Sequence, residues 1–163
     1  MANRFVLNTI SYHGSGAIKE IPGELQRRGY KKIFVCSDPD LVKFGVTAKV
    51  TDELDAAGIA WSLYSEIKPN PTIKNVQDGV AAFKASSADM IVAVGGGSAM
   101  DTAKGIAYYT GLPMVIVPTV CATDAPCSSL SVMYTDECVF DAYLFLDNCP
   151  NVVIVDSEII ARA

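Results

Sequence analysis

The chain has 163 residues, of which 50% are hydrophobic, and it carries a formal net charge of -5 at pH 7. This length and composition suit one globular domain, and the acidic balance excludes a basic surface for nucleic acid or an anionic membrane. No apolar run approaches the ~20 residues that cross a bilayer, and no charged segment followed by an apolar one marks a secretory leader. We therefore expect a cytoplasmic protein.

The cysteine and histidine content limits the chemistry further. Five cysteines without any C-x-x-C pair favour a reducing compartment, and we expect free, mostly buried thiols. The single histidine, His13, cannot supply the two or three imidazoles that transition-metal sites usually need. We expect no metal site here and interpret His13 as a polar loop residue or a hydrogen-bonded structural one.

Predicted strands and helices alternate along the chain. In chain order we predict a short edge strand or hairpin over 5–7 and 11–14, a helix over 16–28 weakened or kinked at Pro22 and Gly23, a strand over 33–36, a helix over 46–57, a marginal strand over 59–64, a helix starting after the cap residue Thr72, a strand over 91–94, a helix to about residue 109, a strand over 113–118, a hairpin of 131–134 with 142–146, and a strand over 152–155. This order predicts an α/β fold: a Rossmann-like, largely parallel sheet flanked by helices, with a β-hairpin near the C-terminal end. Without a linker or repeat, residues 1–163 are predicted to form one domain.

The stretch 91–104 is the strongest functional signal. An apolar run too short for a helix ends in Gly95, Gly96 and Gly97, and a helix follows. Glycines let a phosphate approach the backbone, and the first N–H groups of a helix are unpaired, so the pattern predicts an anion site for a pyrophosphate. Ser98 and Asp101 also match a capping box, which is a purely structural interpretation of both residues.

Two other polar segments follow predicted strands. Asp38 comes after the strand over 33–36, and it either accepts hydrogen bonds from a ribose diol or caps the next turn. The acid of the common G-x-G-x-x-G fingerprint follows the glycines by about 20 residues, whereas Asp38 precedes them, so an ordinary assignment of that kind fails. The loop over 119–128 leaves the strand over 113–118 and predicts the second half of a cleft.

These residues resemble the N-terminal, cofactor-binding domain of the iron-containing alcohol dehydrogenase superfamily. Motifs similar to its lactaldehyde reductase branch are RRGY at 27–30, DAAG at 55–58, PNPT at 69–72 and GGGS at 95–98. Motifs similar to its glycerol dehydrogenase branch are PT at 118–119, TDAPCS at 123–128, LSV at 130–132, YTD at 134–136 and NVVIVD at 151–156. Ser98 departs from the lysine usual in the glycerol dehydrogenase branch, and residues 122–124 depart from the G-T-x-x-E motif of the other, which leaves the substrate open.

The resemblance implies an NAD site. It would place Asp38 on the adenosine ribose, favouring NAD over NADP, and would place Gly96, Gly97, Ser98 and Asp101 on the pyrophosphate. The nicotinamide half would be lined by Thr119, Ser128, Leu130 and Tyr134. Asp124 matches a position that contacts polyol hydroxyls, which makes it the candidate catalytic residue.

The implied activity is hydride transfer between nicotinamide and a small alcohol or diol such as glycerol or 1,2-propanediol. Family members hold a divalent metal in a second, helical domain, and we expect that domain to be absent and the chain alone to have little or no activity. The alternatives are a dehydroquinate synthase-like NAD domain and a noncatalytic nucleotide-binding or assembly module. Without the second domain, apolar surface that it would cover is exposed, which would also favour a homo-oligomer.

Overall fold

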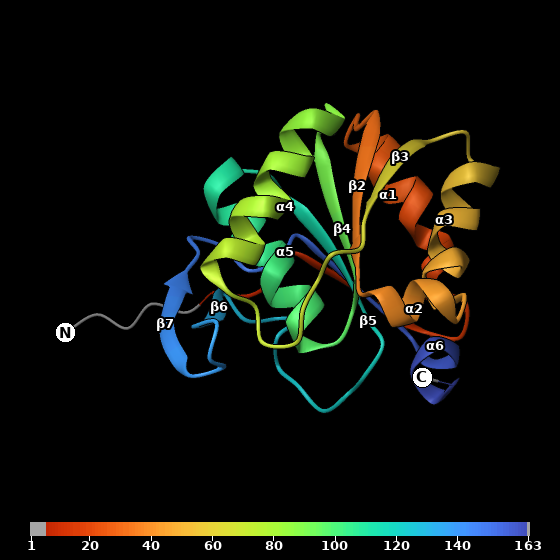
Figure 1. Cartoon of the computed structure of the whole chain (residues 1–163). Coiled ribbons are helices and arrows are strands. Elements are labelled where there is room, and N and C mark those ends of the chain that lie inside the picture. The colour runs from red at the N-terminus through yellow and green to blue at the C-terminus, as the bar shows by residue number, and fades with distance from the viewer. Residues whose placement is uncertain (1–5, 163) are drawn as a thin grey trace.

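A six-stranded parallel sheet forms the centre of the computed structural model, which describes residues 6–162 (Figure 1). Its strand order is β1-β8-β5-β4-β2-β3. The strands are β1 (Ile10–Gly14), β2 (Lys32–Ser37), β3 (Ala60–Tyr64), β4 (Met90–Gly95), β5 (Met114–Pro118) and β8 (Val152–Asp156). β4 and β5 are buried along their whole length, as expected for strands covered on both faces. The predicted α/β class and parallel sheet are confirmed.

Helices cover both faces of the sheet (Figure 1). They are the short 3-10 helix η1 (Ala17–Glu20), α1 (Ile21–Arg27), α2 (Pro39–Lys43), α3 (Val46–Ala56), α4 (Ile73–Ser86), α5 (Gly97–Thr110) and α6 (Ser157–Arg162). α1 and α3 pack on one face through buried residues such as Leu25 and Leu54. α4 and α5 pack on the other face through Val76, Met100 and Ile106. Within the described residues, no helix is long and apolar enough to cross a membrane.

The predicted hairpin forms a separate two-stranded sheet. β6 (Leu130–Tyr134) and β7 (Phe140–Phe145) pair antiparallel. Met133 of β6 is fully buried in the same core as α5, so the hairpin is held against that helix. In Figure 1 it lies at the side of the main sheet, and β6 contacts α5.

Two N-terminal predictions need correction. Residues 6 and 7 are not in a strand and residue 5 lies outside the described residues, so β1 is a single edge strand, parallel to β8. The helix predicted over 16–28 is divided into η1 and α1. Pro22 stands in the first turn of α1, where a missing N–H removes no helical hydrogen bond, so the proline starts a helix instead of kinking one.

The prediction of mostly buried thiols was wrong, although all five cysteines are free. Cys36 and Cys149 are buried, whereas Cys121, Cys127 and Cys138 are exposed. The exposed three lie in loops, where the backbone stays at the surface to reach water. Burial raises the pKa of the Cys36 thiol well above its usual range, which keeps that thiol protonated and unreactive.

Two glycines allow α4 and α5 to approach closely. A Cβ atom on Gly105 would lie 2.6 Å from Cγ2 of Val76, and one on Gly79 would lie 2.5 Å from Cδ1 of Ile106. Val76 and Ile106 are fully buried, so neither can move into open space. The helix crossing therefore depends on the absence of side chains at these positions.

Gly105→Ala should lower the free energy of unfolding by about 1–3 kcal/mol, because the added methyl group overpacks the α4–α5 contact. Gly23→Ala is the matched control, since its Cβ would meet only an Arg27 nitrogen at 3.9 Å. That control should be neutral or stabilising by roughly 0.5–1 kcal/mol, the ordinary gain of alanine over glycine in a helix. Urea unfolding measures both, and an equal effect of the two substitutions would contradict the close packing.

Candidate functional site

The direction of the chain across the sheet reverses between β2 and β4. From β2 the chain moves outward to β3, returns to β4 on the other side of β2, and continues to β5 and β8. Open α/β sheets bind ligands at the carboxyl ends of strands beside such a reversal. At this point Ser37 and Val94 are in register, and the Ser37 hydroxyl donates a hydrogen bond to the Val94 carbonyl at 3.0 Å.

The chain turns from β4 into α5 at a residue that has no room for a side chain. Gly95 has φ +156°, and a Cβ atom there would lie 2.6 Å from Cβ of Ala99. Its carbonyl accepts a hydrogen bond from the Thr119 amide at 3.0 Å. The turn is therefore tied to the end of β5 as well as to β4.

The start of α5 lies earlier than the capping-box interpretation requires, and that interpretation is wrong. Gly96 is the N-cap, Gly97 is the first helical residue, and no side chain caps the helix. Ser98 instead accepts a hydrogen bond from the Asn70 amide at 3.3 Å. With no side-chain cap, the N–H groups of the first turn remain available to an anion.

A cavity of about 390 Å³ lies against this helix start. It is lined by Asp38, Pro39, Asp40, Ile67, Lys68, Pro69, Gly96, Gly97, Ser98 and Ala99. Four of the predicted site residues, Asp38, Gly96, Gly97 and Ser98, are therefore brought together. Lys68 was missed in the sequence, where it stands before a proline-rich connection and shares no motif with the glycines; here it adds a positive charge beside the helix start.

Asp38 has the capping role, one of the two that the sequence left open. Its Oδ1 atom accepts a hydrogen bond from the Leu41 amide at 2.9 Å and caps α2. Its Oδ2 atom would lie 3.5 Å from a Cβ on Gly95, so the carboxylate faces the glycine turn. The cap holds the carboxylate at the edge of the cavity.

The loop after β5 folds back over the same helix start. A Cβ on Gly96 would lie 3.7 Å from Cγ2 of Val120, and one on Gly97 would lie 3.9 Å from Oγ1 of Thr123. Asp124 is exposed, and its carbonyl accepts hydrogen bonds from the amides of Cys127 and Ser128, both at 3.1 Å. The turn at 124–128 thereby fixes the path of the chain toward β6.

The other predicted residues do not line the cavity. Thr119 is buried next to the glycine turn. Ser128 precedes β6, Leu130 and Tyr134 are the first and last residues of β6, and all three are half-buried. The Tyr134 amide donates to the Pro71 carbonyl at 2.9 Å, which joins β6 to the segment that forms the cavity rim. The two segments predicted to form the cleft are thus adjacent, and the 390 Å³ cavity lies on the side of the glycine turn.

Asp101 and Lys104 form a buried ion pair on α5 that the sequence did not reveal. Lys104 is 0% exposed, and its Nζ lies 3.5 Å from Oδ1 of Asp101. Burial raises the pKa of the Asp101 carboxyl and lowers the pKa of the Lys104 ammonium, and each charge opposes the shift of the other. The available signal was a lysine three residues after an aspartate on an apolar helix face.

The described residues do not fit a metal ion. Among residues 6–162, no group of three or more His, Cys, Asp or Glu side chains could hold one. His13 lies on the edge strand β1, where its Nε2 is 2.6 Å from the Ser11 hydroxyl, as the structural interpretation predicted. No chemical step through a metal is therefore derived from these residues.

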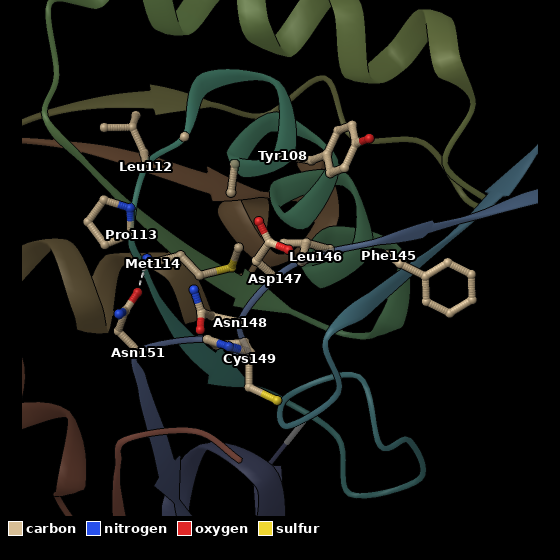
Figure 2. A pocket seen from close by; sticks show the side chains of 13 residues that line it. Tyr108, Leu112, Pro113, Met114, Phe145, Leu146, Asp147, Asn148, Cys149 and Asn151 are labelled. Atoms are coloured by element: carbon tan, nitrogen blue, oxygen red, sulfur yellow. Dashed lines mark hydrogen bonds between the residues drawn. The ribbon is translucent and has the colours of Figure 1, made fainter. Parts of the chain in front are cut away.

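A larger cavity of about 520 Å³ lies at the opposite end of the sheet (Figure 2). Met114, the first residue of β5, lines it together with Tyr108, Phe145 and Asn151. The Asn151 Oδ1 atom accepts a hydrogen bond from the Met114 amide at 3.1 Å, shown as a dashed line in Figure 2. None of the predicted site residues lines this cavity, so its greater size does not make it the candidate site.

Sequence comparison finds one matching family model and several similar proteins. A family model described as iron-containing alcohol dehydrogenase matches residues 8–157. Lactaldehyde reductase of Escherichia coli K12 is 36% identical over an alignment 180 positions long, which covers 97% of this chain and 47% of the relative. A glycerol dehydrogenase of Escherichia coli O6:H1 is 58% identical over 73 residues, which cover 45% of this chain and 20% of the relative.

Solved structures agree with the sequence relatives. A crystal structure of 1,3-propanediol oxidoreductase matches with a TM-score of 0.90 and 28% identity, over 98% of this chain and 47% of the other. The chain thus spans about half the length of lactaldehyde reductase and of this oxidoreductase.

Substitutions at the glycine turn should show that Gly95 is required for stability and that Gly97, at the helix start, is not. Gly95→Ala should cost about 2–4 kcal/mol of unfolding free energy, since it combines a strained φ with a steric clash against Ala99. Gly97→Ala should change the stability by less than about 0.5 kcal/mol, because its Cβ meets nothing closer than 3.9 Å. Chemical denaturation compares the two, and a similar loss in both would contradict this geometry.

Proposed function

The chain belongs to the iron-containing alcohol dehydrogenase family, and from this membership we propose that it is an NAD(H)-binding domain of an alcohol or polyol dehydrogenase. The observation that carries the proposal is the uncapped start of α5 behind Gly95, facing a cavity edged by the Asp38 carboxylate. Helix N–H groups favour a pyrophosphate, and a carboxylate at the edge of the same cavity favours a ribose diol. The protein is acidic overall, so this binding would depend on local groups.

Each predicted residue has a proposed part in that site. Gly96, Gly97 and Ser98 would bind the two phosphates at the helix start, and Asp38 would accept hydrogen bonds from the adenosine ribose. The positions proposed for the nicotinamide side are Thr119, Ser128, Leu130 and Tyr134. Asp101 is assigned differently from the sequence-based expectation, because its carboxylate is engaged with Lys104 and the Val132 amide rather than with the helix start.

The proposed reaction interconverts a small alcohol or diol, such as glycerol or 1,2-propanediol, with its carbonyl form. When bound, nicotinamide supplies the acceptor or donor of the hydride. Exposed Asp124 would contact substrate hydroxyls as a hydrogen-bond acceptor. The described residues contain no group of three or more His, Cys, Asp or Glu side chains that could bind iron. We therefore assign none of them as a metal ligand.

We propose little metal-dependent alcohol oxidation by the 163-residue chain alone, because it has one histidine. Chelator-sensitive turnover by the purified chain would contradict this.

We also propose self-association through β7, on which Phe140, Tyr143 and Phe145 are 50%, 52% and 69% exposed. The Tyr143 ring contacts the rings of both Phe140 and Phe145. Light scattering showing a strict monomer at high concentration would argue against it.

Titration with NADH, followed by its fluorescence, tests the proposed site. Gly97→Val should weaken binding of NADH and of ADP-ribose at least roughly tenfold, because two γ-methyl groups would occupy the space in front of the helix N–H groups. Gly23→Val makes the same chemical change on α1 and should leave both affinities unchanged. Binding that survives Gly97→Val would place the dinucleotide elsewhere.

The same titration separates a dehydrogenase domain from a noncatalytic nucleotide-binding module. A dehydrogenase domain should bind NADH more tightly than ATP, since only the intact dinucleotide reaches both halves of the cleft. Equal or tighter binding of ATP would favour the module.

Asp38→Asn tests the choice between NAD and NADP. Asparagine is as good a helix cap as aspartate, so α2 should remain intact while the negative charge is removed. The preference for NADH over NADPH should fall roughly tenfold, because a 2′-phosphate would no longer face a carboxylate. Asp52→Asn, on an exposed position of α3, is the charge-matched control and should preserve the preference.

A further inference from the structure

Lys104 is a buried cation that the proposed reaction does not use. Its Nζ donates to the Leu130 carbonyl at 2.8 Å and to the Ser128 hydroxyl at 3.0 Å, and it lies 3.5 Å from Oδ1 of Asp101. Three different groups therefore surround the ammonium, one on its own helix and two on the segment that enters β6. A fully buried lysine is rare in proteins unless its charge is paired in this way.

The same pair of helical residues makes further contacts with the hairpin. The Val132 amide donates to Oδ2 of Asp101 at 3.3 Å, and the Ser131 hydroxyl donates to the Asp101 carbonyl at 2.7 Å. α5 is thus joined to four consecutive or near-consecutive residues, 128 and 130–132. The helix whose start forms the phosphate side also holds the segment proposed for the nicotinamide side.

The hydrogen bond between Lys104 and Ser128 has a direction. An ammonium is only a donor, so the Ser128 oxygen must be the acceptor. The hydroxyl hydrogen of Ser128 is then left to point away from Lys104, and a charge-assisted bond holds this arrangement more firmly than a neutral one would. Ser128 is half-buried, so part of this residue remains open to contact with a ligand.

We propose that Lys104 is a positioning residue, which fixes the 128–130 segment against α5 and orients the Ser128 hydroxyl as a donor toward a carbonyl group on the nicotinamide side of a bound dinucleotide. The inference rests on the proposed NAD function and extends it to a residue that touches neither cofactor nor substrate. The ligand group that the Ser128 hydroxyl would recognise is the carboxamide oxygen of nicotinamide, which accepts a hydrogen bond. It would not be a phosphate.

A purely structural role for Lys104 would have a different consequence. If the lysine only stabilised the packing of β6 on α5, its removal would weaken all ligand binding together by loosening the fold. If it acts through Ser128, its removal should weaken only ligands that carry the nicotinamide ring. NADH and ADP-ribose differ in this ring and share the adenosine and both phosphates.

Isothermal titration of the purified chain with NADH and with ADP-ribose tests the proposal in Lys104→Met, Ser128→Ala and the double variant. Each single variant should weaken NADH binding roughly fivefold to tenfold, the usual loss for one hydrogen bond, and change ADP-ribose binding less than about twofold. The double variant should be no weaker than the worse single variant, since both changes remove the same interaction. Lys74→Met, which breaks the exposed Lys74–Asp78 pair on α4, is the matched control and should change neither affinity.

Other outcomes would overturn the proposal. Equal losses for NADH and ADP-ribose, additive losses in the double variant, or an unchanged NADH affinity in Lys104→Met would each reject it while leaving the NAD site itself intact. Failure of the unmodified chain to bind either ligand would instead reject the proposed function, and this inference with it. If Lys104→Met does not fold because Asp101 is left unpaired, Asp101→Asn with and without Lys104→Met gives the same comparison without an unpaired Asp101 carboxylate.

Discussion

The turn between β4 and α5 depends on the close approach of Gly95 to Ala99, which leaves no space for a side chain. Because the chain turns sharply there, the first turn of α5 starts directly at the carboxyl end of the most buried part of the sheet. Gly96 then starts the helix without any side-chain cap. The steric constraint at one residue therefore creates the free N–H groups on which the rest of the site is built, and it does so without a basic surface.

The surrounding contacts keep this helix start in place from three sides. The Thr119 amide joins the turn to the end of β5, the Ser98 hydroxyl accepts from Asn70, and Asp38 caps the neighbouring helix α2 with one carboxylate oxygen. Further along α5, Asp101 and Lys104 join the helix to the hairpin. The contacts of the glycine turn and those of the hairpin thus lie along one helix, and the close approach of α4 and α5 at Gly79 and Gly105 fixes the position of that helix.

Local patterns in the sequence predicted most of this architecture, and contacts between distant residues explain what it missed. The apolar run before Gly95 is enough to predict a buried strand, and Thr72 caps α4 as its position indicated. The capping box failed because a helix start that differs by only two residues gives Ser98 a different role. Lys104 could not be assigned because its partners Ser128 and Leu130 lie 24 and 26 residues further along the chain, and no period links them.

The pairing of β1 with β8 joins the first and the last strand of the described residues in one sheet. Ile10 is opposite Val152 and Gly14 is opposite Asp156, so this edge requires the closure of nearly the whole chain. Contacts of such long sequence separation form slowly, because the entropy of closing the loop is lost before any bond is gained. During synthesis on the ribosome, β1 would therefore remain without its neighbour until β8 has been translated, which makes β1 one of the last strands to join the sheet.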